Sequence, residues 1–245
     1  MSLRLLCIVA HPDDECFAFG GALALASDRG VEVSILCLTD GQAATHRGTA
    51  QSGEQLGALR AEEFAASCEV LGAKHYELWN YQDAQLEHHT LHELGGRLVE
   101  RMRRFRPHLV LTFGSEGALN NHPDHTAVSA ATTAAFHWSG NPKRFPDAGE
   151  PWRPERLFYL TTDFFLPDRL PPLVAPWTCV LDIRSVRDRK RRAFEQHTSQ
   201  APLMQTARIV FEEHGAKEKY TLAYTRDPQA ASIVTDLFAG LSAGA

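Results

Sequence analysis

Two short motifs in the chain carry residues that could bind a metal ion and activate water. HPDDE at residues 11–15 follows an apolar run, and HPDH occupies residues 122–125. The first motif places three carboxylates in a row, and adjacent negative charges repel one another unless a cation or a helix N-terminus compensates them. A bound metal ion would provide that compensation.

Both motifs are expected at the same edge of a parallel sheet. A strand-like apolar run at 3–10 precedes the first motif, and another at 108–114 precedes the second. Ligand sites of open α/β sheets lie beyond the carboxyl ends of the strands, so Asp14 and His125 can meet although they are distant in the chain. Two imidazoles, one carboxylate and an open position are typical of a hydrolytic zinc site, and the same ligand count fits a two-histidine, one-carboxylate iron oxygenase.

Strand-like and helix-like segments alternate along most of the chain, which predicts an α/β fold built from βα units. We expect a Rossmann-like three-layer α/β/α sandwich with a mostly parallel sheet, in a single domain spanning 1–245. A less regular, proline-rich excursion is expected at about 139–156. The predicted strands are 3–10, 31–41, 75–81, 108–114, 157–162, 179–183 and 220–225, and the predicted helices are 15–30, 56–72, 91–107, a run from Thr126, and 186–197.

Composition and charge narrow the classes of partner. The net charge of −5 lacks the basic footprint of a dedicated nucleic-acid binder. No apolar run is long enough to cross a membrane, and the N-terminal stretch has no small-residue cleavage site, so we expect a cytoplasmic protein. Five cysteines without a CxxC pair predict buried thiols in a reducing compartment. The basic runs at 101–106 and 187–192 are predicted to be solvated helix faces.

The two motifs resemble those of a known enzyme family. AHPDDE (10–15) and HPDHTAV (122–128) are similar to the motifs of the LmbE-like, or PIG-L, metal-dependent N-acetylglucosaminyl deacetylases. One departure is Asn121, which stands where a glycine is common. The resemblance extends over about the first 200 residues, through LTDG (38–41), RAEEFAASCEVLGA (60–73), the Asp83 of NYQDAQL and KRRAFEQHTSQ (190–200).

The resemblance implies roles for the residues of both motifs. The metal ligands would be His11, Asp14 and His125. Asp13 would be the general base, because adjacent backbone positions cannot direct two carboxylates at one metal, whereas Asp13 can reach the water that the metal activates. His122 would be a second catalytic group, three residues before His125 and able to face the same pocket without being a ligand.

Further residues are expected around this centre. The resemblance implies that Arg60, Asp83 and His197 contact the substrate, with Gln200 behind His197. Asp124 is a candidate to orient a histidine. Two of the polar residues also have structural interpretations. Arg60 could form an ion pair with Glu63 on the same helix, and Glu15 could serve the first turn of its helix.

The resemblance implies a zinc-dependent hydrolase, with Fe²⁺ as an alternative metal, that removes acetyl from an N-acetylglucosamine conjugate. The substrate ranked first is N-acetylglucosaminyl-malate of bacillithiol biosynthesis, followed by the inositol conjugate of the mycothiol route and chitobiose-type sugars. A small amino sugar is therefore the expected partner, and family members often form trimers or hexamers. Three alternatives stay open: an amidase for another acylated amine, the iron oxygenase, and a non-catalytic sugar-binding module that would leave Asp13 and His122 without a task.

Overall fold

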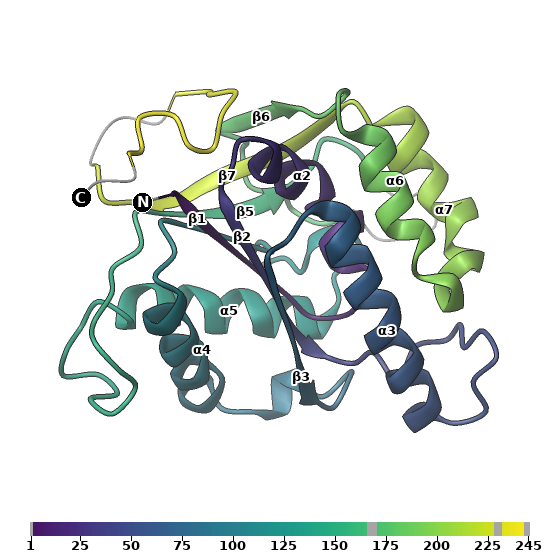
Figure 1. Ribbon diagram of the computed structural model, residues 1–245, viewed down its shortest axis with the longest axis horizontal. Helices are drawn as coiled ribbons and strands as arrows, with labels where there is room; N and C mark the ends of the chain where they lie inside the picture. Colours follow the sequence, from purple (N-terminus) through teal and green to yellow (C-terminus); the bar gives the residue numbers. More distant parts are fainter. Residues whose placement is uncertain (1, 166–170, 228–231, 243–245) are drawn as a thin grey trace.

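The computed structural model describes residues 2–165, 171–227 and 232–242, whose strands form one sheet in the order β3-β2-β1-β4-β5-β7-β6 (Figure 1). The first five strands in that order are parallel, whereas β7 is antiparallel to β5 and β6 is antiparallel to β7. The prediction of a mostly parallel sheet is confirmed. The strands are β1 (Arg4–Val9), β2 (Glu32–Thr39), β3 (His75–Tyr81), β4 (Leu109–Thr112), β5 (Arg156–Thr161), β6 (Cys179–Asp182) and β7 (Lys217–Thr225).

Helices cover both faces of the sheet, which gives the expected α/β/α layers. Figure 1 shows α4 and α5 on one side and α2, α3 and α6 on the other, and α6 packs against both α2 and α3. The helices are α1 (Asp14–Phe17), α2 (Gly20–Asp28), α3 (Gly53–Leu71), α4 (Leu91–Phe105), α5 (Pro123–Trp138), α6 (Arg187–Glu195) and α7 (Met204–Arg208). 3₁₀-helical turns lie at Leu86–His88, Ala118–Asn120 and Thr198–Leu203, and a π-helical turn lies at Ile209–Glu213.

Local sequence signals set the ends of the longer helices. The Ser52 hydroxyl accepts the N–H of Gln55 at the start of α3, and the Thr90 hydroxyl accepts the N–H of Glu93 at the start of α4. Gly72 ends α3 in the left-handed conformation, with φ of 81°. These signals explain why the expected and observed bounds of both helices differ by only a few residues.

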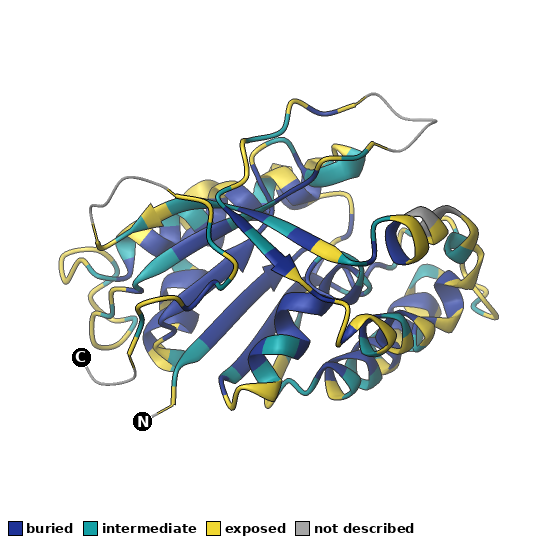
Figure 2. Ribbon diagram, turned by 90° about the horizontal axis from the view of Figure 1, so that it is seen from above, coloured by how far each residue is buried: buried dark blue, intermediate teal, exposed yellow. Residues whose placement is uncertain are grey.

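The hydrophobic core lies along the central strands, which Figure 2 shows as buried. From Leu5 to Val9 every residue of β1 is fully buried, because helices cover both faces of a parallel sheet. All five cysteines are free and buried, as predicted. Among the helices of the described residues, none combines the length and hydropathy that crossing a membrane would require.

The prediction of one continuous helix at 15–30 was wrong, because the structure divides this segment into α1 and α2. The buried carboxylate of Glu218 on β7 accepts the N–H groups of Gly21 and Ala22, at 2.7 and 2.8 Å. A helix N-terminus favours negative charge, so a new helix begins at this carboxylate. A Cβ at Gly21 would lie 2.5 Å from the Ile183 side chain, so this close approach requires glycine.

The prediction that the two basic runs are solvated was also wrong in part. Lys190 is 3% exposed, and its Nζ lies 2.6 Å from Oε1 of Glu218. Arg101 donates to the Ser34 hydroxyl at 2.8 Å and is likewise buried. Each buried cation is satisfied by a partner from another element, which composition alone does not reveal.

Arg103 holds the irregular excursion after α5 in place. Its guanidinium is 3% exposed, and it donates five hydrogen bonds of 2.6–3.2 Å to backbone carbonyls. The acceptors are Ser139, Asn141, Arg144, Phe145 and Gly149. Besides its own turn hydrogen bonds, this segment without helix or strand is thus tied to α4 by a single side chain.

We predict that Arg103→Ala lowers the free energy of unfolding by about 3 kcal/mol, because five backbone carbonyls lose their charged donor. Arg104→Ala is the matched control. Arg104 is exposed and pairs with Glu77 at the surface, so its removal should cost less than about 1 kcal/mol. Urea unfolding of both variants measures the difference. Equal losses in the two variants would contradict the anchoring role of Arg103.

Candidate functional site

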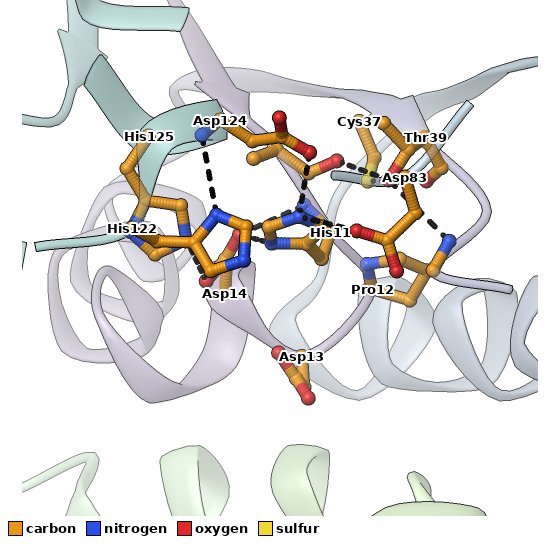
Figure 3. A network of polar contacts seen from close by, with 12 residues as sticks. His11, Pro12, Asp13, Asp14, Cys37, Thr39, Asp83, His122, Asp124 and His125 are labelled. Carbon is orange, nitrogen blue, oxygen red and sulfur yellow. Dashed lines mark hydrogen bonds and ion pairs between the residues drawn. The ribbon is translucent and has the colours of Figure 1, made fainter. Parts of the chain in front are cut away.

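The two HPD motifs meet where β1 and β4 end. These strands are neighbours in the centre of the sheet, and the chain leaves them toward opposite sides, which is the usual position of ligand sites in open α/β sheets. His11 follows β1, whereas His125 lies in the first turn of α5. Figure 3 shows their side chains and that of His122 around Asp14. The predicted convergence of the two motifs is therefore present in the structure.

The Asp14 carboxylate lies between the rings of His11 and His125. Its Oδ2 is 3.4 Å from Nδ1 of His11, and its Oδ1 is 3.3 Å from Nε2 of His125. Nε2 of His11 faces two other carboxylates, Asp83 at 3.0 Å and Asp124 at 3.2 Å. Nε2 of His11 is thus occupied by two carboxylates, and Nδ1 is the ring nitrogen that faces Asp14.

The second histidine is oriented in the same manner by a backbone group. Nδ1 of His125 donates to the carbonyl of Gly117 at 3.1 Å. Its Nε2 is buried and has no hydrogen-bond partner among the described residues. Such an orphaned nitrogen beside a carboxylate fits a metal ligand, because metal-bound imidazoles usually donate their other N–H to a carbonyl or carboxylate.

The donor set suits a divalent transition metal. Two imidazole nitrogens and one carboxylate oxygen are ligands that Zn²⁺ and Fe²⁺ both accept. One nitrogen atom from each of His11, His122 and His125 also lies within 4.8 Å of the others. Burial would raise the pKa of Asp14, but its two histidine neighbours hold that pKa well below its usual value. Asp14 is therefore an anion that can bind a cation.

His122 and Asp124 are fixed by the start of α5. Nδ1 of His122 accepts the N–H of Asp124 at 3.2 Å, which places the proton of a neutral ring on Nε2. Burial, followed by the nearby rings of His11 and His125, lowers the pKa of His122 and favours this neutral form. The Asp124 carboxylate is fully buried and accepts the N–H groups of Ala84 and Leu86 as well as facing His11.

The backbone at Asn121 is compatible with the glycine that the family resemblance leads us to expect there. Asn121 has φ of 51° and ψ of 37°, within the left-handed region. Glycine enters this region freely, and asparagine is among the residues that tolerate it best. The departure from the family pattern thus preserves the backbone turn before His122.

Asp13 is held in a conformation that is rare for a residue with a side chain. Its φ is 100°, at a cost of about 1–3 kcal/mol for such strained positions. Nη2 of Arg60 lies 3.0 Å from its Oδ2 and also donates to the carbonyl of Pro12. Burial raises the pKa of Asp13 to about 6, against the opposing charge of Arg60. Figure 3 shows its carboxylate turned away from the histidine cluster.

The predicted substrate contacts are more buried than expected. Arg60, Asp83 and His197 are 3%, 6% and 1% exposed, and none of them lines the cavity beside the site. Arg60 contacts Asp13, Asp83 faces His11, and Nε2 of His197 lies 2.8 Å from Glu15. Their direct contact with a substrate stays a prediction, and the structure instead places all three beside motif residues.

Two further expectations differ in detail. Arg60 does not pair with Glu63, whose carboxylate accepts the hydroxyl groups of Thr198 and Ser199, both at 2.7 Å. Gln200 is buried and donates to the carbonyl of His46 at 2.9 Å, so it ties the segment after α6 to the loop after β2. These contacts hold the segment after α6 against α3 and against the loop after β2.

A cavity of about 250 Å³ opens beside the candidate site and includes Asp13, Asp14 and His125 in its wall. Much of the remaining wall is aromatic or aliphatic. Glu116 and Asn120, which no motif singled out, also line the cavity. Their position just after β4, at the carboxyl edge of the sheet, was the available signal. The apolar wall residues include Phe17, Phe113, Leu160, Phe164 and Phe194.

The fold and the site together are those of an α/β protein with a histidine–carboxylate centre at its topological switch point. A family model described as PIG-L, GlcNAc-PI de-N-acetylase, matches residues 6–136, more than half of the chain. The chain belongs to this family, as its motifs predict.

Named relatives and a solved structure refine this comparison. A Rhodococcus jostii protein named 1D-myo-inositol 2-acetamido-2-deoxy-alpha-D-glucopyranoside deacetylase is 31% identical, over 80% of this chain and 81% of its own. A Bacillus cereus protein named probable N-acetyl-alpha-D-glucosaminyl L-malate deacetylase 2 is 30% identical, over 55% of this chain and 61% of its own. GalB, the 4-carboxy-2-hydroxymuconate hydratase from Pseudomonas putida KT2440, superposes with a TM-score of 0.75 at 20% identity, over 93% of this chain and 99% of its own. That last likeness shows the fold alone.

We predict that zinc stabilises the protein through His125. A metal at 100 times its Kd should add about 2.7 kcal/mol to the free energy of unfolding, and His125→Ala should remove most of that gain. Thermal unfolding with zinc and with a chelator measures the effect, alongside elemental analysis of bound metal. His88→Ala, at an exposed histidine, is the control. An undiminished zinc effect in His125→Ala would exclude this metal site.

Proposed function

We propose that the protein is a metal-dependent N-deacetylase that acts on a conjugate of N-acetylglucosamine. The observation that carries this proposal is the shared orientation of His11 and His125, whose Nδ1 and Nε2 atoms, respectively, face opposite oxygens of Asp14. Membership of the PIG-L family and the names of the two relatives support the same reaction.

The residues around the centre have different roles in the proposed amide hydrolysis. Zn²⁺ or Fe²⁺ held by His11, Asp14 and His125 would lower the pKa of water and polarise the acetyl carbonyl. Asp13 lines the cavity and takes the proton from the attacking water. Nε2–H of His122 donates to the carbonyl oxygen as negative charge develops on it.

In the second half of the reaction, Asp13 gives the proton that it took from water to the departing nitrogen. The water oxygen becomes bonded to the acetyl carbon, and the bond between that carbon and the sugar nitrogen breaks. Protonated Asp13 gives its proton to the departing nitrogen, so the products are acetate and a free amino sugar. A carboxyl whose pKa burial raises to about 6 can both accept and release a proton near neutral pH.

The relatives, rather than the metal centre, support the choice of conjugate that we propose. The inositol-conjugate relative matches over a larger share of the chain than the malate-conjugate relative. We therefore place the inositol conjugate before N-acetylglucosaminyl-malate, which reverses the order that the family resemblance implied. Nothing in the His11–Asp14–His125 cluster itself recognises a sugar ring, so an amidase for another acylated amine is the alternative.

We predict release of free primary amine from N-acetylglucosaminyl-inositol, faster than from the malate conjugate and from diacetylchitobiose. The zinc-loaded protein is incubated anaerobically with each compound, and amine and acetate are both quantified. Equal amounts of the two products establish deacetylation and exclude an oxygen-dependent reaction. A lack of amine from all three sugars, with hydrolysis of a simple N-acetylated amine, would replace the sugar deacetylase by the amidase.

We predict that Asp13→Asn lowers kcat about 10²- to 10⁴-fold, because the attacking water loses its general base. Zinc binding should persist, since the predicted ligands are unchanged. The control is Asp188→Asn, which alters an exposed carboxylate on α6. Steady-state kinetics and bound metal are measured on the same samples. Wild-type kcat in Asp13→Asn would remove Asp13 from the mechanism.

A further inference from the structure

Glu15, the last residue of the HPDDE motif, has no part in the reaction proposed above. It is nevertheless completely buried, in contrast to an ordinary acidic residue in the first turn of a helix. Its Oε2 accepts the backbone N–H of Asp13 at 2.9 Å. Its Oε1 accepts the Ser67 hydroxyl at 2.5 Å and lies 2.8 Å from Nε2 of His197.

The contact with Asp13 acts on a strained part of the backbone. Asp13 lies at φ of 100° and ψ of −27°, directly before α1. A residue with a side chain leaves this region unless surrounding contacts hold it there. The Glu15 carboxylate reaches back over the turn to the Asp13 N–H, as the acidic member of a capping box does. This bond is therefore placed to maintain the unusual conformation.

His197 compensates the negative charge of the buried Glu15 carboxylate. Burial would raise the pKa of Glu15, but the charge and hydrogen bond of His197 hold that pKa below its usual value. Neither side chain of this pair has any solvent exposure. Glu15 lies on α1, and its carboxylate is fixed from two other places in the fold, by Ser67 on α3 and by His197 just after α6. Such a carboxylate is a rigid support.

We propose that Glu15, paired with His197, is a positioning residue that holds Asp13 in the orientation required for proton transfer. This inference rests on the proposed function of Asp13. The support acts on the backbone of Asp13 through Glu15, while Arg60 holds the side chain at 3.0 Å. It also gives His197 a role other than contact with substrate, in agreement with its burial.

The test compares Glu15→Ala with Glu15→Gln. We expect Glu15→Ala to lower kcat about 10²-fold, the loss typical of a misplaced catalytic group, with KM and bound zinc unchanged. Glu15→Gln should retain most of kcat, because its amide oxygen can still accept the Asp13 N–H. Asp188→Asn, at an exposed carboxylate on α6, is the control and should keep wild-type kcat. Equal losses of kcat in Glu15→Gln and Glu15→Ala would overturn the inference.

Two further measurements separate positioning from a general structural role. In the Asp13→Asn background, Glu15→Ala should cost no further kcat, because residues that act as a unit are not additive. A crystal structure of Glu15→Ala should show Asp13 outside the left-handed region or its carboxylate displaced from Arg60. An additive loss of kcat, or an unchanged Asp13 geometry, would overturn the inference. If Glu15→Ala does not fold, Glu15→Met fills the space without accepting a hydrogen bond and replaces it in each measurement.

The outcomes also distinguish this inference from the proposed function. If Asp13→Asn keeps wild-type kcat, the general-base role fails and the inference fails with it, whatever the crystal structure shows. If Asp13→Asn loses activity while Glu15→Ala does not, the proposed function stands and the positioning role alone fails.

Discussion

Three consecutive carboxylates lie at the end of β1, with Asp14 and Glu15 buried and Asp13 partly exposed, and the rest of the site depends on how their charges are compensated. Like charges at this spacing cannot share one low-dielectric environment without separate partners. Each of the three carboxylates has its own partner residues. The pairs are Asp13 with Arg60, Asp14 with His11 and His125, and Glu15 with His197 and Ser67. Because each charge has its own partner, adjacent residues can take different roles.

This compensation also connects the layers of the fold. Arg60 and Ser67 come from α3, and His197 follows α6, so one helical layer supplies the partners of Asp13 and Glu15. His125 comes from α5 in the opposite layer. Tertiary packing of both layers on the sheet is therefore a condition for assembling the site. Buried ion pairs stabilise little by themselves, because desolvation offsets their attraction. Their value here lies in orientation.

Sequence patterns predicted the parts of the structure that local chemistry determines. The strand at 75–81 was placed correctly from its composition and its flanking residues, and the two HPD motifs indicated their meeting point through the parallel topology. The division of the first helix was missed, because its cause is the distant carboxylate of Glu218. The burial of Arg60 and His197 was missed for the same reason, since their partners lie on other elements. Antiparallel β6 and β7 likewise depend on contacts that no local pattern encodes.

The chemistry and the choice of substrate are contributed by different parts of the chain. The family match ends at residue 136 and includes every predicted metal ligand. The cavity wall also uses residues beyond it, among them Phe164 and Phe194. A hydratase shares the fold over almost its whole length, so the arrangement of strands and helices does not determine which bond is hydrolysed or hydrated. Under the proposed function, selection among amino-sugar conjugates would arise from the shape and polarity of this wall, because the His11–Asp14–His125 cluster carries no group that recognises a sugar ring. The aromatic side chains of the wall are the first candidates for that selection.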